Sequence, residues 1–392
     1  MKIDNKKIRI LGKGITALAL KDKFPNAVLY DDKDFDTYDK NSDELTVVSP
    51  GIPPYNQMVL NSNNVISDYD LFQEIMPFSI WISGTNGKTT TTQMCQHLLN
   101  EYDSVCGGNI GIPLSHLNEN KKIWILETSS FTLHYTHKSK PNIYLLLPIT
   151  EDHITWHGSF EEYKNAKLKP LELMNENDVA IIPYEFKDFK TEAHVITYNN
   201  SDELCNHFGF DKFKINFKEP FLLDAILAMA TRKIIFDEIN YDLINQFKID
   251  KHKVEEFFDK KNRLWIDDSK ATNVDATING LTPYRKDNLH LILGGDDKGA
   301  NLKPLFENIK ELDLTVYAIG SNTDKIVNYC KEYSINVEKC DFLNIAVEKM
   351  NNNMNKKSIG ILSPAAASLD QFKSYAHRGD EFKNLVNSLS LN

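Results

Sequence analysis

Short hydrophobic runs alternate with longer segments of mixed polar and apolar residues throughout this chain of 392 residues. The runs lie at 8–11, 28–30, 45–48, 78–82, 123–126, 143–147, 179–182, 264–266, 289–293, 316–319 and 359–362. Runs of this length, separated by segments long enough for a helix, are typical of buried parallel strands joined by helices. The pattern therefore predicts an α/β protein with mostly parallel sheets.

The residues that follow these strands divide the chain into three stretches, and its length fits about two or three domains. We expect a Rossmann-like domain over 1–76, a central domain over 77–250 and a second Rossmann-like domain over 251–392. In the first stretch a turn with Gly12 and Gly14 follows one strand, and Asp31 follows the next. This arrangement can hold a nucleotide diphosphate.

The most informative segment is 83–90, Ser-Gly-Thr-Asn-Gly-Lys-Thr-Thr, between a predicted strand and a predicted helix over 91–99. Glycines let backbone N–H groups approach phosphate, and the helix N-terminus adds partial positive charge. Lys88 would reach the β- and γ-phosphates, and the Thr89 hydroxyl would bind Mg²⁺. The segment therefore predicts a P-loop-type ATP site. The alternative is a glycine-rich turn that happens to precede a lysine, because Ile82 stands where the general pattern has glycine.

Two further candidates follow central strands. Glu127 follows the run at 123–126, and His153 comes shortly after the run at 143–147. Parallel strands end at one edge of a sheet, so both side chains would lie near the phosphate loop, as candidate Mg²⁺ ligands. Taken singly, each could instead be a charge at a helix start or a polar loop residue. His153 and His157 have the spacing of a zinc pair, but no Glu accompanies them in what we expect to be a loop, so no zinc site is predicted.

The third stretch carries three polar turns after strands, at 267–273, 294–299 and 363–372. Two of them contain a lysine, Lys270 and Lys298. Each could be only a polar turn. Together at one edge of a sheet, they favour binding of anions and carboxylates.

Composition narrows the class of partner. The formal net charge of -10 argues against nucleic acid as a partner. The N-terminus lacks the apolar core of a signal peptide, and no apolar run is long enough to cross a membrane. Five scattered cysteines without a CxxC pair suit a reducing compartment. We therefore expect a cytoplasmic protein without membrane insertion.

These motifs together resemble the Mur ligase family, whose members add amino acids to the peptidoglycan precursor with ATP. The resemblance spans nearly the whole chain and rests on the order and spacing of segments 84–90, 108–111, 127–131, 150–153, 268–273 and 294–298. Segment 363–372, followed by Arg378 and Gly379, resembles the members that add D-glutamate. The Asp-Asn-Pro-Arg tetrapeptide of the members that add diaminopimelate or lysine is absent from the sequence.

The resemblance implies a reaction. ATP would phosphorylate the alanyl carboxylate of UDP-N-acetylmuramoyl-L-alanine, and the amine of D-glutamate would attack the acyl phosphate. It also implies a monomer, a UDP-substrate domain over 1–76, an ATP domain over 77–250 and an amino-acid domain over 251–392.

The resemblance also assigns roles to residues. The implied catalytic residues are Lys88, Asn109, His153, Lys167 and Lys270. ATP would be bound by Gly84, Thr85, Asn86, Gly87, Lys88, Thr89, Thr90, Lys253 and Asp268. Two Mg²⁺ ions would be held by Thr89, Glu127, His153 and a carbamylated Lys167, whose surroundings in the sequence do not otherwise mark it. The UDP substrate would contact Gly14, Ile15, Thr16, Asp31, Ser49 and Gly51. D-Glutamate would contact Thr272, Lys298, Ser368, Leu369 and Tyr375.

The chain departs from the family pattern at three places. Lys253 stands where the family usually has Arg, which keeps the charge but loses the forked geometry. Segment 220–224, Pro-Phe-Leu-Leu-Asp, stands where the family has the His-Asn…Asn adenine motif, and Asp224 is the candidate substitute. Tyr375 replaces the usual Phe and adds a hydroxyl near the D-glutamate residues.

Three alternatives remain open at this point. The first is another ligase of the family, or one of the folylpolyglutamate synthase type, that adds a different amino acid. The second is a UDP-sugar or nucleotide-binding module without ligase activity, which the changes at Lys253 and Asp224 motivate. The third is a P-loop ATPase that couples hydrolysis to motion.

Overall fold

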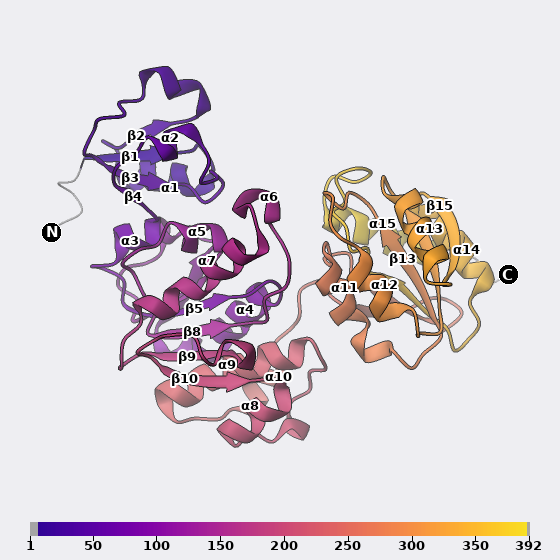
Figure 1. Ribbon diagram of the computed structural model, residues 1–392. Helices are drawn as coiled ribbons and strands as arrows, with labels where there is room; N and C mark the ends of the chain where they lie inside the picture. Colours follow the sequence, from indigo (N-terminus) through magenta and orange to yellow (C-terminus); the bar gives the residue numbers. More distant parts are fainter. Residues whose placement is uncertain (1–6, 390–392) are drawn as a thin grey trace. The chain divides into compact units, whose positions relative to one another are not determined.

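The computed structural model describes residues 7–389, and its backbone has the predicted mixed α/β architecture (Figure 1). Among the described residues, parallel pairing dominates three sheets of four, six and six strands. The chain forms two compact units, one of residues 1–217 and 221–247 and the other of residues 218–220 and 248–392. The first two sheets belong to the first unit and the third sheet to the second.

The first sheet has the order β2-β1-β3-β4, and all of its pairs are parallel. Its strands are β1 (Ile8–Leu11), β2 (Val28–Tyr30), β3 (Leu45–Val48) and β4 (Val65–Ile66). The connecting elements are α1 (Ile15–Lys23), a 3₁₀ helix η2 (Asp32–Thr37) and α2 (Gln57–Leu60). Since its strands run in one direction, the turns after β1, β2 and β3 share one edge of this sheet.

The second sheet has the order β10-β9-β8-β5-β7-β6 and is also parallel throughout. Its strands are β5 (Phe78–Ser83), β6 (Ser104–Gly108), β7 (Ile123–Glu127), β8 (Ile143–Leu146), β9 (Val179–Pro183) and β10 (His194–Tyr198). Its helices are α4 (Lys88–Leu99), α5 (Ser130–His134), α6 (Ile154–His157), α7 (Phe160–Leu173), α8 (Ser201–Phe208), α9 (Phe221–Phe236) and α10 (Tyr241–Asn245). Strand β5 is therefore flanked by β7 and β8, whose carboxyl ends carry the predicted metal ligands.

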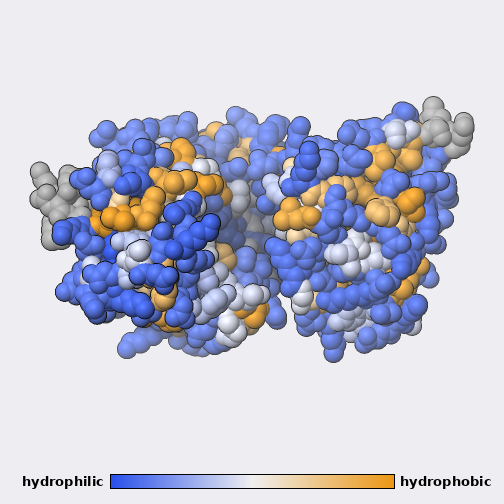
Figure 2. All heavy atoms as spheres, turned by 90° about the horizontal axis from the view of Figure 1, so that it is seen from above, coloured by the Kyte–Doolittle hydropathy of each residue, from blue (hydrophilic) through white to orange (hydrophobic). Residues whose placement is uncertain are grey.

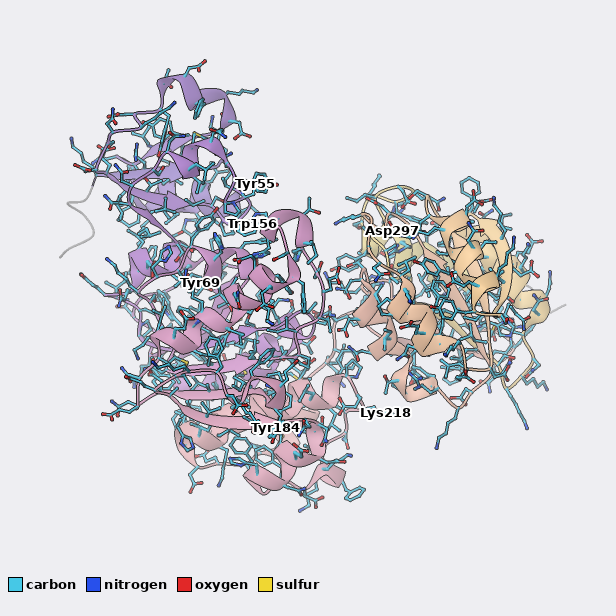
Figure 3. All side chains as sticks on the ribbon, viewed as in Figure 1. Tyr55, Tyr69, Trp156, Tyr184, Lys218 and Asp297 are labelled. Carbon is cyan, nitrogen blue, oxygen red and sulfur yellow. The ribbon has the colours of Figure 1, made fainter. Side chains whose placement is uncertain are left out.

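One hydrophobic core joins the first two sheets through α3 (Asp68–Phe72). This core contains residues of β1 and β3 together with Tyr69, Phe72 and the central tryptophans Trp81 and Trp124. Tyr69, labelled in Figure 3, packs edge-on against Trp81 with ring centroids 4.8 Å apart. The shared core fixes the first sheet relative to the central sheet, because close-packed interiors resist sliding.

The third sheet has the order β11-β12-β16-β13-β14-β15, with only β11 antiparallel to its neighbour among the described pairs. Its strands are β11 (Glu255–Phe258), β12 (Leu264–Asp267), β13 (Leu289–Gly294), β14 (Leu314–Ile319), β15 (Asn336–Asp341) and β16 (Ile359–Leu362). Its helices are α11 (Val274–Leu281), α12 (Lys303–Ile309), α13 (Thr323–Glu332), α14 (Leu343–Asn353) and α15 (Tyr375–Ser388). Two hydrophobic clusters pack these helices onto the sheet.

The predicted strands are all present, because each is a short apolar run that the core buries. Five strands were not predicted: β4, β6, β10, β11 and β15. Their sequences mix polar and apolar residues, and all five lie at sheet edges, where burial is incomplete. The expected loop around Trp156 is instead the short helix α6. The division into three domains at 76/77 and 250/251 stays a prediction.

The surface visible in Figure 2 is mainly hydrophilic, with hydrophobic side chains gathered in limited patches. Among the described residues, no helix is both long and apolar enough to cross a membrane.

Replacing Gly360 by alanine should lower the free energy of unfolding of the second unit by about 1–3 kcal/mol. A Cβ atom at this position in β16 would lie 2.5 Å from Cε3 of Trp265, whose indole is fully buried. Urea unfolding followed by tryptophan fluorescence measures the effect. Gly51→Ala is the control, since its Cβ would meet no atom within 4 Å. Equal unfolding midpoints for the two variants would contradict this packing.

Candidate active site

The phosphate loop joins the end of β5 to the start of α4. Gly84 and Gly87 adopt φ values of 137° and 84°, which favour glycine. A Cβ atom at Gly84 would lie 2.5 Å from Cβ of Leu147, so the loop packs directly on the chain that follows β8. Asn86 lies between the glycines, and Thr90 is buried in the first turn of α4.

Side chains hold this loop in place. The Thr85 hydroxyl contacts the carbonyl of Thr150 and the hydroxyl of Tyr163, both at 3.0 Å. The Lys88 ammonium donates to the carbonyls of Gly84 at 3.0 Å and Thr85 at 2.7 Å. Its position at the start of α4 would let it exchange these carbonyls for phosphate oxygens, and the helix N-terminus favours the same anion.

Glu127, at the end of β7, connects the loop to a second turn. Its carboxylate is 2% exposed and accepts hydrogen bonds from the Thr89 hydroxyl at 2.8 Å and the Asn109 amide at 2.7 Å. The backbone N–H of Asn109 also donates to the carbonyl of Glu127 at 2.9 Å. A hydroxyl, a carboxylate and an amide form a set of oxygen donors that suits Mg²⁺.

Lys167 projects from α7 beneath the phosphate loop. Its side chain is 1% exposed, and its Nζ donates to the carbonyl of Gly84 at 2.7 Å. The Nζ also lies over the Tyr163 ring, 4.7 Å from its centroid. Burial and then the nearby Lys88 ammonium lower the pKa of Lys167 well below its usual value, against the opposing carboxylates of Asp152 and Glu127. The side chain is therefore not the solvated lysine that its local sequence suggests.

His153, the residue before α6, is more exposed to solvent than Glu127 and Lys167. Its side chain is 48% exposed, and its Nε2 is 3.7 Å from Oδ2 of Asp152. The ring contacts Phe131 with centroids 4.7 Å apart. His157 instead points inward to the Ser130 hydroxyl at 3.0 Å, and burial lowers its pKa to about 3. The two histidines therefore differ in exposure and in polar partner, although both rings contact Phe131.

The residues assigned to the UDP substrate gather at one edge of the first sheet. Gly14, Ile15 and Thr16 begin α1 after β1, while Asp31 follows β2 and pairs with Lys13 at 2.8 Å. Ser49 and Gly51 follow β3. Trp156 of α6, labelled in Figure 3, packs against the hydrophobic cluster at this edge. The central sheet thus contributes an aromatic side chain to the surroundings of the predicted UDP site.

In the second unit, Asp268 is buried and 5% exposed. Its carboxylate accepts from the Ser363 hydroxyl at 2.6 Å and from the Val254 N–H at 3.2 Å, and burial raises its pKa to about 7. Lys253 pairs with Asp250 at 3.0 Å. The Lys270 ammonium lies over the Tyr375 ring, 4.0 Å from its centroid. Of this group, Lys270 is exposed at the surface of the unit.

The remaining D-glutamate candidates lie on neighbouring turns of the same unit. Asp296 and Ala367 exchange two backbone hydrogen bonds, which bring the turn of Lys298 beside the turn of Ser368. Lys298 is exposed, Ser368 is buried, and Leu369 is 69% exposed. Thr272 is exposed on the turn after β12. The structure therefore places these residues at one edge of the third sheet.

The buried guanidinium of Arg378 links these turns. It donates to the hydroxyl and carbonyl of Ser269 and to the carbonyls of Ala366 and Ala367, at 2.8–3.3 Å. Burial lowers its pKa to about 10, which leaves it a cation at neutral pH. The family motif marked Arg378 in the sequence, but nothing in the sequence showed which loops it joins.

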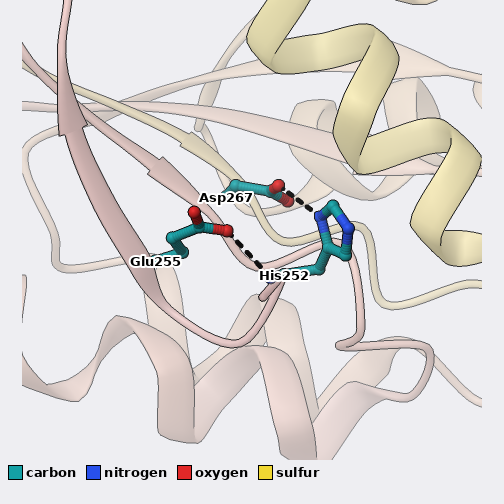
Figure 4. A group of neighbouring side chains, drawn as sticks. All are labelled: His252, Glu255 and Asp267. Carbon is teal, nitrogen blue, oxygen red and sulfur yellow. Dashed lines mark hydrogen bonds and ion pairs between the residues drawn. The ribbon is translucent and has the colours of Figure 1, made fainter. Parts of the chain in front are cut away.

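One cluster at the start of the second unit was missed by sequence reasoning (Figure 4). Nδ1 of the His252 ring lies 2.6 Å from Oδ2 of Asp267, and the backbone N–H of His252 donates to Oε2 of Glu255 at 3.0 Å. These three residues could hold a metal ion by their spacing. The Lys383 ammonium already lies 2.8 Å from Glu255 and 3.6 Å from Asp267, so the cluster is better described as an ion-pair network that fixes the loop of Lys253.

Comparison with known proteins shows the family of this chain. Residues 82–219 match the Mur ligase middle domain. The UDP-N-acetylmuramoylalanine--D-glutamate ligase of Campylobacter jejuni (strain RM1221) is 47% identical over 98% of this chain and 100% of its own length. The chain belongs to the Mur ligase family. The corresponding ligase of Helicobacter pylori (strain HPAG1) is 42% identical over 97% of this chain and 99% of its own length.

Solved structures of two Mur ligases and of FolC share the fold. MurF ligase from Thermotoga maritima in complex with ADP aligns with a TM-score of 0.62 and 15% identity, covering 98% of this chain and 96% of its own. MurC from the same organism aligns with a TM-score of 0.57 and 15% identity, covering 96% and 98%. E. coli FolC in complex with DHPP and ADP aligns with a TM-score of 0.57 and 13% identity, covering 81% and 91%. The Mur ligase fold predicted from the sequence is therefore confirmed.

Gly84→Ala should weaken ADP binding at least about tenfold, because an L side chain is strained at this φ by roughly 1–3 kcal/mol and its Cβ would clash with Leu147. Isothermal titration calorimetry gives the affinity. Gly209→Ala is the control, since it shares a positive φ of 68° but would meet no atom within 4 Å. If both variants bind ADP as the native chain does, the loop does not bind phosphate in this conformation.

Proposed function

We propose that this protein is an ATP-dependent ligase that joins D-glutamate to UDP-N-acetylmuramoyl-L-alanine. The observation that carries the proposal is the contact of Thr89 and Asn109 with the Glu127 carboxylate at the start of the phosphate-loop helix. The names of the Campylobacter and Helicobacter relatives supply the substrates. The likeness to both over nearly the whole chain favours this reaction over a different amino acid or a nucleotide-binding module without activity.

A carboxylate is a poor electrophile until one of its oxygens becomes part of a good leaving group. In the proposed reaction an alanyl carboxylate oxygen attacks the γ-phosphorus of ATP, and ADP departs. The uncharged amine of D-glutamate then attacks the acyl carbon, forming a tetrahedral intermediate. This intermediate expels inorganic phosphate and loses a proton from nitrogen, which leaves an amide.

The residues of the phosphate loop serve the first step. Transfer of the γ-phosphate brings two anions together, so Lys88 and the N–H groups of the loop stabilise the charge. Thr89 and Glu127 would hold one Mg²⁺ ion, and His153 and Lys167 a second. Bound Mg²⁺ supplies positive charge at the phosphates and the reacting carboxylate. Asn109 would contact the reacting groups from the turn after β6.

Lys167 would act as a carbamate. Its uncharged amine adds to CO₂ with loss of a proton, and the resulting carbamate is an anion that can bind metal. Its burial beside Gly84, with a strongly lowered pKa, supports this role. An unmodified lysine at this place would supply no negative charge to Mg²⁺.

The other assigned residues complete the proposal. The edge of the first sheet with Gly14, Asp31 and Ser49 would bind UDP, and Lys253, Asp268 and Lys270 would serve the nucleotide. The turns with Lys298 and Ser368 would bind D-glutamate. We also propose a monomeric cytoplasmic enzyme of three domains that divide at 76/77 and 250/251.

Phosphate release from ATP tests the proposed function. The protein with Mg²⁺ and UDP-N-acetylmuramoyl-L-alanine is compared with D-glutamate, L-glutamate, L-lysine and no amino acid. We expect release only with D-glutamate and the UDP substrate together, and no release from Lys88→Ala, although this variant still binds the UDP substrate. Release without the UDP substrate would indicate an ATPase. Release with another amino acid would keep the family and change the specificity.

Lys167→Ala should abolish ligation, and short carboxylic acids such as acetate or propionate should restore part of it. The acid would replace the carbamate in the space left by the side chain. Initial rates with and without added acid measure the rescue, and Lys164→Ala is the control, because this α7 lysine pairs with Glu161 of the same helix. If Lys167→Ala keeps native activity, the carbamate has no role.

A further inference from the structure

Asp224 lies in the first turn of α9 and faces the phosphate-loop helix α4, against which α9 packs. Its carboxylate is 3% exposed, and Oδ1 accepts a hydrogen bond from the Thr91 hydroxyl at 3.0 Å. Thr91 is fully buried on α4, and its hydroxyl also lies 3.1 Å from the Gly87 carbonyl. Both oxygens are acceptors, so the Asp224 carboxylate and the Gly87 carbonyl of the phosphate loop share the single proton of the Thr91 hydroxyl.

The same oxygen also packs directly on the loop. A Cβ atom at Gly87 would lie 2.6 Å from Oδ1 of Asp224 and 3.0 Å from Cδ2 of Leu147. Gly87 is the residue before α4 and has a φ of 84°, so its N–H direction depends on a conformation that few other residues adopt. Asp224 and Leu147 therefore enclose Gly87 from two sides.

A buried carboxylate is costly unless something compensates its charge. The start of α4 provides partial positive charge close to Asp224. The buried Asp224 carboxylate is therefore stable only while the phosphate loop and the start of α4 keep this conformation. A bound nucleotide phosphate would need the same conformation. The family pattern suggested an adenine contact at this position, and the structure places Oδ1 within hydrogen-bond distance of the Thr91 hydroxyl and directly beside Gly87.

We propose that Asp224 is a positioning residue that holds the phosphate loop in its binding conformation through Thr91 and Gly87. It acts on the phosphates through the loop and contacts neither ATP nor the reacting atoms. This inference rests on the proposed nucleotide site. It predicts that the hydrogen bond to Thr91 matters for nucleotide affinity, and that the negative charge of Asp224 does not.

Calorimetric titration with ADP tests this without requiring ligation. We expect Asp224→Ala and Thr91→Val each to weaken ADP binding about tenfold, which corresponds to about 1.4 kcal/mol. The double variant should bind no more weakly than Thr91→Val, because both changes break one interaction. Asp224→Asn keeps an acceptor oxygen and should stay within about threefold of the native affinity. In ligation assays the KM for ATP should rise while the KM for D-glutamate stays unchanged.

Asp178→Ala is the matched control for loss of a buried carboxylate. Asp178 pairs with Lys140 just before β9, at the sheet edge opposite the phosphate loop. It should lower the melting temperature and leave ADP affinity unchanged. Valine has nearly the same shape as threonine but lacks the hydroxyl, so Thr91→Val should fold. This variant still tests the hydrogen bond if Asp224→Ala fails to fold.

Three results would overturn the proposal: native ADP affinity in Asp224→Ala or Thr91→Val, losses that multiply in the double variant, or Asp224→Asn as weak as Asp224→Ala. If the native chain binds ADP but does not ligate, the proposed function is overturned. The ADP affinities of the Asp224 and Thr91 variants still test the positioning role in that case. A native chain that does not bind ADP overturns both.

Discussion

The candidate site depends most on the buried carboxylate of Glu127. It is an anion with almost no access to water, and its two oxygens are held by Thr89 from the phosphate-loop helix and Asn109 from the turn after β6. Three separate elements therefore converge on one charge. A buried anion held only by neutral donors is incompletely compensated, which makes this point favourable for a divalent cation.

Lys167 is a second buried ionisable group in this region, and its burial disfavours the charged ammonium form. Taking an ammonium out of water costs several kcal/mol, so the low pKa of Lys167 is the physical result of its burial beneath Gly84. A structural role alone would be filled better by an apolar residue of similar length. A buried amine at this position is understandable if it reacts with CO₂ to form the proposed carbamate.

The fold was predictable because the central strands are apolar and short, and the phosphate loop has a specific order of glycine, lysine and threonine. Glu127 was predictable from its place directly after a buried strand. The contact of Asp224 with Thr91 was not, since 133 residues separate them and only the packing of α9 on α4 brings them together. The edge strands β10 and β15 were missed because their polar residues give no clear period.

Asp268 shows what the structure adds to motif reasoning in the second unit. Its motif assigns it to the nucleotide, and the structure shows that its carboxylate also accepts hydrogen bonds from Ser363 and from the Val254 backbone. Together with the network of His252, Asp267 and Lys383, this carboxylate holds a loop in which His252 and Val254 adopt positive φ values. Motifs identify residues that a family needs, while contacts show which part of the molecule each one serves.

The central claim is that ATP activates a carboxylate, and an isotope label follows that step directly. UDP-N-acetylmuramoyl-L-alanine labelled with ¹⁸O in its alanyl carboxylate is ligated to D-glutamate, and the released phosphate is analysed by mass spectrometry. The account predicts one ¹⁸O atom in each phosphate, because the attacking carboxylate oxygen leaves with phosphorus. Unlabelled phosphate would show that water attacks ATP, and would contradict the acyl-phosphate mechanism.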